Sequence, residues 1–349
     1  VFCIDAMFRA FFRASCVAFD TLISNTPQWA AGDCTMHYAL VFSTSKPPAF
    51  DKPLSGNGNA SEWLSDLASL FAFLCPDGEA YWLDNGYAAE ILCYPDHSFT
   101  TEHIHKNFAF QALRNAAAER QLDVNIVPAI GRQKRLLVAD MDSTIIKSES
   151  LDDLAEMAGI GEEVAAITKR SIRGEIDFEE ALCERVAMLR GHSSQLFETL
   201  IARAEVTSGA ITLVQTMRAN GAKCYLISGG FDFLTKSVAA LCGFHTHHAN
   251  HMNVDNGKIV GTIKMPVLDR EAKANYLRHY CKIHGVDADG AATIGDGAND
   301  LAMLQAAGMG TAFAGKPILR DRIAIQLDYS DLRGLLYLQG YKQADFVCA

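Results

Sequence analysis

The sequence predicts an α/β protein: a doubly wound parallel sheet with an inserted helical cap, preceded by a smaller α+β N-terminal domain. Its 349 residues are enough for about two domains. After about residue 133, apolar strand-like runs alternate with helical segments, which is typical of a parallel sheet covered by helices. All three tryptophans, Trp29, Trp63 and Trp82, precede that point, so the front of the chain differs in composition.

A short polar and basic link separates the two parts, and we place the domain boundary there. Residues 1–132 are expected to form the N-terminal α+β domain, with a regulatory or a dimerising role left open. Residues 133–349 are expected to form the second domain, whose helical cap covers about 148–207. In the front domain, 61–74 reads as a helix and 39–43 as a strand, and no chemical motif is found there.

Strand and helix patterns follow one another through the second domain. The expected strands are 136–140, 222–228, 291–295 and 310–313, with a hairpin at 254–260 that turns at Asn256-Gly257. The expected helices begin at about 150 and continue at 162–173, 178–190, 193–204, 209–220 and 299–307. Ser150 is the expected N-cap of the first helix and Gly159 its end. Because helices interrupt the sheet after its first strand, we expect them to form a lid.

Polar side chains follow three of these strands. They are Asp140 and Asp142 after the first, Ser228 and Gly229 after the second, and Asp296, Asn299 and Asp300 after the third. Ligands of open parallel sheets collect at the carboxyl ends of the strands, so these groups are expected to lie together. Clustered carboxylates need a cation, and Mg²⁺ prefers oxygen ligands and a substrate phosphate. Lys273, which taken alone reads as a solvated lysine, would contact a phosphoryl group in this setting.

The ordered set resembles the haloacid-dehalogenase-like phosphatases and, within them, the phosphoserine phosphatases in their long bacterial form with an N-terminal domain. The resemblance covers residues 136–310 and rests on 140–149, on Phe178 with Arg185, and on 227–231 and 295–304. It implies a Rossmann-like sheet and an enzyme that hydrolyses O-phospho-L-serine to L-serine and phosphate, the last step of serine biosynthesis. A related phosphatase or phosphotransferase acting on another small phosphate ester is the alternative.

The resemblance also assigns roles to the motif residues. Asp140 would be the nucleophile, ionised at neutral pH, and would form an aspartyl-phosphate. Asp142 would protonate the leaving oxygen and then activate water. The metal ligands would be Asp140, the Asp142 backbone carbonyl and Asp296, with Asp300 supporting water ligands. The phosphoryl contacts would be Ser228, Gly229, Lys273 and Asn299.

Substrate choice is expected to come from the inserted helices. By the same resemblance, Glu149 would pair with the substrate ammonium and Arg185 with the substrate carboxylate. Phe178 would pack against the methylene group of the substrate. Read without the resemblance, Glu149 is a compensating charge at a helix start and Arg185 a solvated arginine. A different class of protein, an amino-acid-sensing or interaction module built on residues 1–130, is disfavoured by the intact set of acids.

The composition of the chain limits the binding partners and the cellular location that we expect. The net charge of −10 argues against nucleic acid or an anionic membrane as a partner. No run approaches the roughly 20 apolar residues of a membrane span, and 7–13 is not expected to be a transit peptide. The ten irregularly spaced cysteines favour reduced thiols and a cytoplasmic location. A homodimer through the aromatic-rich front domain is an open expectation. The histidines of 245–251 are expected in a solvated loop, not in a zinc site.

Overall fold

The computed structural model describes residues 38–46, 80–93, 105–106 and 108–347. The helix expected at 61–74 lies outside these described residues. Within them, no helix is both long and apolar enough to cross a membrane.

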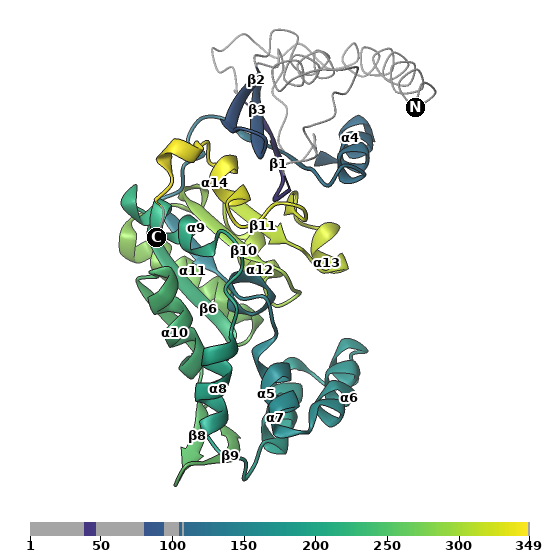
Figure 1. The fold of residues 1–349 in the computed structure, drawn as a ribbon, viewed down its shortest axis with the longest axis vertical. Coiled ribbons are helices and arrows are strands. Elements are labelled where there is room, and N and C mark those ends of the chain that lie inside the picture. Colours follow the sequence, from purple (N-terminus) through teal and green to yellow (C-terminus); the bar gives the residue numbers. More distant parts are fainter. Residues whose placement is uncertain (1–37, 47–79, 94–104, 107, 348–349) are drawn as a thin grey trace. The chain divides into compact units, whose positions relative to one another are not determined.

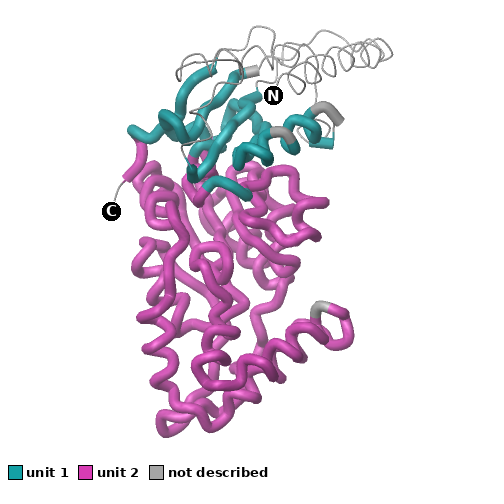
Figure 2. The backbone as a smooth tube through the Cα atoms, turned by 45° about the vertical axis from the view of Figure 1, so that its right-hand side comes forward, with its two compact units in different colours: residues 1–132, 328–330, 337–344 teal, residues 133–327, 331–336, 345–349 magenta. Residues whose placement is uncertain are grey.

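The chain divides into two compact units (Figure 2). One comprises residues 1–132, 328–330 and 337–344, and the other 133–327, 331–336 and 345–349. Two short segments that the sequence assigned to the second domain therefore belong with the first. One reason is the buried carboxylate of Asp123, which accepts backbone hydrogen bonds of 2.7–3.2 Å from Asp328, Tyr329 and Ser330. The assignment of the two units as independent domains stays a prediction.

The first unit contains an antiparallel sheet. Its strands are β1 (Tyr38–Ser43), β2 (Ala80–Asp84), β3 (Ala88–Cys93) and β4 (Asp123–Pro128), in the order β2-β3-β1-β4. Helix α4 (Phe108–Ala118) packs Phe110 into the same core as Leu40 and Ile91. The strand expected at 39–43 is confirmed as β1, whose residues are all buried.

The second unit is built on a parallel sheet, which confirms the predicted α/β class (Figure 1). Its strands are β5 (Leu136–Ala139), β6 (Lys223–Phe231), β7 (Thr246–Asn250), β10 (Ala291–Gly295), β11 (Met309–Phe313) and β12 (Ile325–Leu327). They lie in the order β12-β11-β10-β5-β6-β7, with parallel pairing throughout. The central strands β5 and β10 are wholly buried apolar runs, as expected where helices cover both faces.

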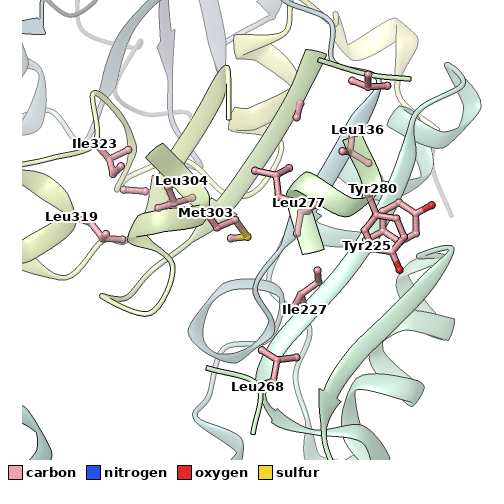
Figure 3. Packing of buried hydrophobic residues seen from close by; sticks show 14 residues of the cluster. Leu136, Tyr225, Ile227, Leu268, Leu277, Tyr280, Met303, Leu304, Leu319 and Ile323 are labelled. Carbon is pink, nitrogen blue, oxygen red and sulfur yellow. The ribbon is translucent and has the colours of Figure 1, made fainter. Parts of the chain in front are cut away.

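Helices pack against this sheet and fix the strands that carry the polar groups. They are α9 (Ala210–Ala219), α10 (Asp232–Cys242), α11 (Arg270–His284), α12 (Leu301–Gln305) and α13 (Pro317–Arg320). Helix α14 (Gly334–Leu338) follows near the end of the chain. Figure 3 shows Leu136 and Ile227 of the strands with Leu277 and Met303 of the helices. Full burial of such a side chain contributes about 1.5–3 kcal/mol, so this core holds the strand ends firmly.

The inserted segment is helical, as predicted. It comprises α5 (Ser150–Ala158), α6 (Gly161–Ile172), α7 (Phe178–Met188) and α8 (Gln195–Arg203) (Figure 1). The predicted N-cap is wrong: Glu149 takes that position, and the Ser150 N–H donates to Asp142 Oδ1 at 2.8 Å. A carboxylate from a distant loop therefore satisfies the first turn of α5.

The predicted hairpin is also present, as β8 (Met252–Asp255) and β9 (Lys258–Ile263). Its turn residues, Asn256 and Gly257, have φ values of 47° and 71°, as a type I′ turn requires.

The solvated loop expected for the histidine cluster is wrong for two of its four members, since His245 and His251 are exposed outside strands but the other two are not. His247 and His248 belong to β7, an edge strand of the parallel sheet. His247 hydrogen-bonds the Thr235 hydroxyl at 2.8 Å, and His248 bonds the Tyr280 hydroxyl at 2.5 Å. The strand was missed because its sequence, Thr-His-His-Ala-Asn, lacks an apolar alternation.

Candidate active site

Strand β5 delivers two carboxylates to one place. Asp140 continues the pairing with β10, because its N–H donates to the Ile294 carbonyl at 3.0 Å. The chain then makes an irregular turn over Met141–Ile145, in which Ser143 has a left-handed φ of 54°. This turn brings both Asp140 and Asp142 to the wall of the same cavity.

Lys273 binds two of the predicted acids. Its Nζ lies 2.6 Å from Asp140 Oδ1 and 2.6 Å from Asp300 Oδ1, and all three side chains are buried. Burial alone would lower the pKa of Lys273, but the two carboxylates raise it above its ordinary value. Lys273 is therefore a fixed ammonium that orients the Asp140 carboxylate.

Asp142 is held by Ser228 and by the start of α5. The Ser228 hydroxyl donates to Asp142 Oδ2 at 3.0 Å and receives the Gly230 N–H at 2.8 Å. Burial raises the pKa of Asp142, although the hydrogen bonds from Ser150 and Ser228 oppose the shift. A Cβ at Gly230 would lie 2.7 Å from Asp142 Oδ2, so only glycine allows this approach.

Three acids could hold a metal ion. Carboxylate oxygens of Asp140, Asp296 and Asp300 lie within 4.8 Å of one another. Among the described residues, no other set of three or more His, Cys, Asp or Glu side chains could hold a metal ion in this way. Burial raises the pKa of Asp140; Asp300 raises it further, and Lys273 lowers it. Buried Lys273 and half-exposed Lys316 carry two positive charges against three buried carboxylates, so the donor set fits a hard divalent cation such as Mg²⁺.

A cavity of about 130 Å³ joins these groups to the cap. It is lined by Asp140, Asp142, Glu149, Ser150, Leu151, Phe178, Leu182, Arg185, Gly229, Gly230, Phe231, Asp296, Asn299 and Lys316. Three predicted site residues, Ser228, Lys273 and Asp300, do not line the cavity. Ser228 hydrogen-bonds to Asp142, and Lys273 hydrogen-bonds to both Asp140 and Asp300. The structure thus brings every predicted site residue into one constellation.

The cap side of the cavity carries Glu149, Arg185 and Phe178. The Ser143 hydroxyl donates to Glu149 Oε1 at 3.0 Å. Burial lowers the pKa of Arg185, and the nearby acids Asp152 and Glu149 oppose the shift. A Cβ at Gly229 would lie 3.4 Å from the Phe178 ring, so the ring lies close to the backbone of Gly229 in β6.

Sequence reasoning missed three residues of the site. Lys316 lines the cavity and pairs with Asp296 at 2.9 Å. Buried Asn250 donates to the Gly229 carbonyl at 2.8 Å and accepts from the Leu268 N–H at 2.7 Å. Asp152 presents a solvent-shielded Oδ1 with no hydrogen-bond partner. Only Lys316 had an available signal, since it follows the predicted strand at 310–313.

Comparison with known proteins agrees with this geometry. Residues 137–305 match the haloacid dehalogenase-like hydrolase family. A phosphoserine phosphatase of Streptococcus thermophilus is 40% identical over 199 residues, which are 57% of this chain and 93% of that protein. The chain therefore belongs to the haloacid dehalogenase-like hydrolases.

Longer relatives and solved structures extend the likeness. A phosphoserine phosphatase of Archaeoglobus fulgidus is 37% identical over 64% of this chain, and the match spans only 65% of that protein's length. A HAD family hydrolase of Salmonella enterica superposes with a TM-score of 0.73 at 25% identity, over 86% of this chain and 98% of that one. A phospho-aspartyl intermediate analogue of phosphoserine phosphatase gives 0.55 at 35% identity, over 59% and 98%.

Proposed function

We propose that this chain hydrolyses O-phospho-L-serine to L-serine and phosphate, with Mg²⁺ as cofactor and a phosphorylated Asp140 as intermediate. One observation carries the proposal: a single cavity is lined by the Asp140–Asp142 pair and by the Glu149–Arg185 pair. A small ester with a phosphate, an ammonium and a carboxylate can meet both pairs at once. Phosphoserine has these three groups, and several relatives of the chain carry the name phosphoserine phosphatase.

In the first step, an Asp140 carboxylate oxygen forms a bond to phosphorus as the ester P–O bond breaks. Asp142 gives its proton to the departing serine oxygen. The raised pKa of Asp142 favours the protonated form that a general acid needs. Lys273 orients the attacking carboxylate through its 2.6 Å contact.

The phosphoryl oxygens need donors that do not rearrange during the reaction. The Ser228 hydroxyl, the Gly229 N–H and the Lys273 ammonium supply them, and Asn299 adds a polar contact. Mg²⁺, when bound, neutralises charge on the phosphoryl group, and Asp140, Asp296, Asp300 and the Asp142 backbone carbonyl would hold it.

In the second step, the Asp142 carboxylate takes a proton from the water that attacks phosphorus. The bond to Asp140 breaks, phosphate leaves and both acids return to their starting forms. Phe178 and the helices of the cap limit the access of further water until then.

Specificity comes from opposite charges on the cap side. Glu149 pairs with the substrate ammonium and Arg185 with its carboxylate, in a fork geometry that suits a planar anion. Serine as product makes this the last step of serine biosynthesis. A homodimer, a cytoplasmic location and a regulatory role for residues 1–132 stay predictions.

Phosphate release tests the proposal. Phosphoserine should be turned over with a higher kcat/KM than phosphothreonine or sugar phosphates, and chelation should abolish turnover until Mg²⁺ is restored. A rapid quench with radiolabelled substrate should trap phosphate on Asp140, and Asp140→Asn should trap none while keeping its circular dichroism spectrum. Phosphate trapped on Ser228, or a preference for another ester, would refute the assignment.

A further inference from the structure

Lys316 contacts two acids that the proposed function uses for different purposes. Its Nζ lies 2.9 Å from Asp296 Oδ2 and 3.4 Å from Glu149 Oε1. Asp296 is a proposed metal ligand, and Glu149 is the proposed partner of the substrate ammonium. The Lys316 ammonium therefore contacts both the carboxylate proposed to bind the metal ion and the carboxylate proposed to bind the substrate ammonium.

The backbone fixes the base of this side chain, whereas its end is held only by the two carboxylates. The Lys316 N–H donates to the Asp296 carbonyl at 2.8 Å, and its carbonyl accepts the Leu319 N–H at 2.9 Å. Pro317 occupies the first turn of α13, which restrains the chain further. The Lys316 side chain is nevertheless 55% exposed. It can exchange partners by rotamer changes, without movement of the loop.

Both contacts conflict with a loaded site. A divalent ion on Asp296 and an ammonium on Glu149 would each place positive charge beside the atoms that Lys316 touches. Like charges at such distances repel, and the Lys316 ammonium, on a side chain that is 55% exposed, can move into water when the cations arrive.

We propose that Lys316 is a positioning residue, whose ammonium contacts Asp296 and Glu149 until the metal ion and the substrate ammonium bind to them. This inference rests on the proposed function. In the unliganded site, its ammonium holds the Asp296 and Glu149 carboxylates in position. It competes with the metal for Asp296 and with the substrate ammonium for Glu149, and it leaves both when they bind.

The competition predicts tighter binding when the charge of Lys316 is removed. Calorimetry with Mg²⁺ alone should show that Lys316→Gln and Lys316→Met bind about three- to tenfold more tightly than the unaltered protein, as expected for loss of a partly exposed pair. Lys316→Arg should stay within about twofold. The matched control is Lys282→Gln, which removes an exposed lysine of α11 outside the cavity lining and should leave Mg²⁺ affinity unchanged.

Steady-state kinetics test whether Lys316 competes with the substrate ammonium for Glu149. In Lys316→Gln, the KM for phosphoserine should fall about two- to fivefold, whereas 3-phosphooxypropanoate, which lacks the ammonium, should keep its KM. Binding of inorganic phosphate at saturating Mg²⁺ should not change. Weaker phosphate binding would make Lys316 a phosphate ligand and would overturn the proposal.

The possible outcomes distinguish failure of the Lys316 proposal from failure of the proposed function. If the unaltered protein binds no Mg²⁺, the proposed metal site fails. If it binds Mg²⁺ and the two neutral variants bind no more tightly, only the role of Lys316 is refuted.

Discussion

Lys273 Nζ donates a 2.6 Å hydrogen bond to Asp140 Oδ1, and the two side chains are only 1% and 4% exposed. A second bond of 2.6 Å joins Lys273 to Asp300, which is fully buried. Removing one member of such a group leaves the others charged and unpaired in a poorly solvated place. We therefore expect stability and activity to depend on Lys273 for separate reasons, and a pair of variants can separate them.

Lys273→Met should lower the free energy of unfolding by about 3–5 kcal/mol, because two buried carboxylates lose their counter-charge. Turnover should fall at least about a hundredfold, since Asp140 loses its orienting contact and the phosphoryl group a donor. Urea denaturation followed by far-UV circular dichroism measures the first effect without metal, and phosphate release measures the second.

The control is the double variant Lys273→Met with Asp300→Asn. It removes one positive and one negative charge, so it should recover a large part of the lost stability and remain inactive. Equal destabilisation of the single and double variants would show that packing around Lys273 matters more than its charge.

Asp142→Asn should separate the two chemical steps. The amide can neither donate a proton to serine nor accept one from water, so phosphoserine turnover should fall by about two to four orders of magnitude. p-Nitrophenyl phosphate needs no protonation of its leaving group. With this ester, the variant should release about one equivalent of nitrophenol in a burst and then stop, because the phosphorylated Asp140 cannot be hydrolysed. Sustained turnover without a burst would show that Asp142 is not the base of the second step.

The sequence was informative where chemistry follows an apolar strand. Asp140 and Asp296 stand directly after apolar strands, and Ser228 follows the apolar run within β6, so their meeting at one edge of the sheet could be predicted. Lys316 follows the predicted strand at 310–313 but was not predicted, because a single lysine after a strand is no motif without a partner in the sequence. Asn250 was missed together with β7, which lies at the sheet edge and has a polar sequence.

The misplaced N-cap has a different cause. Ser150 has the residue type that caps helices, and local rules assign it that position. In the fold its N–H is satisfied by Asp142, eight residues earlier, through the turn after β5. A contact of this kind depends on tertiary structure, and no local propensity reports it.

Glu149 and Arg185 should fail in different ways when they are neutralised. Arg185→Ala should raise the KM for phosphoserine by about tenfold or more, since charge-assisted bonds contribute roughly 1.5–3 kcal/mol. It should have little effect on phosphoethanolamine, which lacks a carboxylate. Glu149→Gln should weaken both substrates, because both carry an ammonium. Initial rates with the two substrates check this, and loss of phosphoethanolamine turnover in Arg185→Ala would contradict the assigned carboxylate contact.

Asp123 offers a test in the other unit, away from catalysis. Burial raises its pKa to about 6, although backbone N–H groups of residues 328–330 donate to it and oppose the shift. A carboxyl whose pKa is higher in the folded state than its ordinary 3.8 stabilises the fold most when it is protonated. Its contribution is therefore complete below about pH 4 and is lost as the pH rises through about 6.

Asp123→Asn should remove this pH dependence and destabilise the first unit, because the amide nitrogen cannot accept the N–H groups that a carboxylate oxygen accepts. Trp82 lies in β2 of this unit, so its fluorescence during urea unfolding reports on the unit. The stability advantage of the unaltered protein over the variant should shrink between pH 4 and pH 7. If the advantage is constant over that range, Asp123 keeps an ordinary pKa, and the N–H donors outweigh its burial.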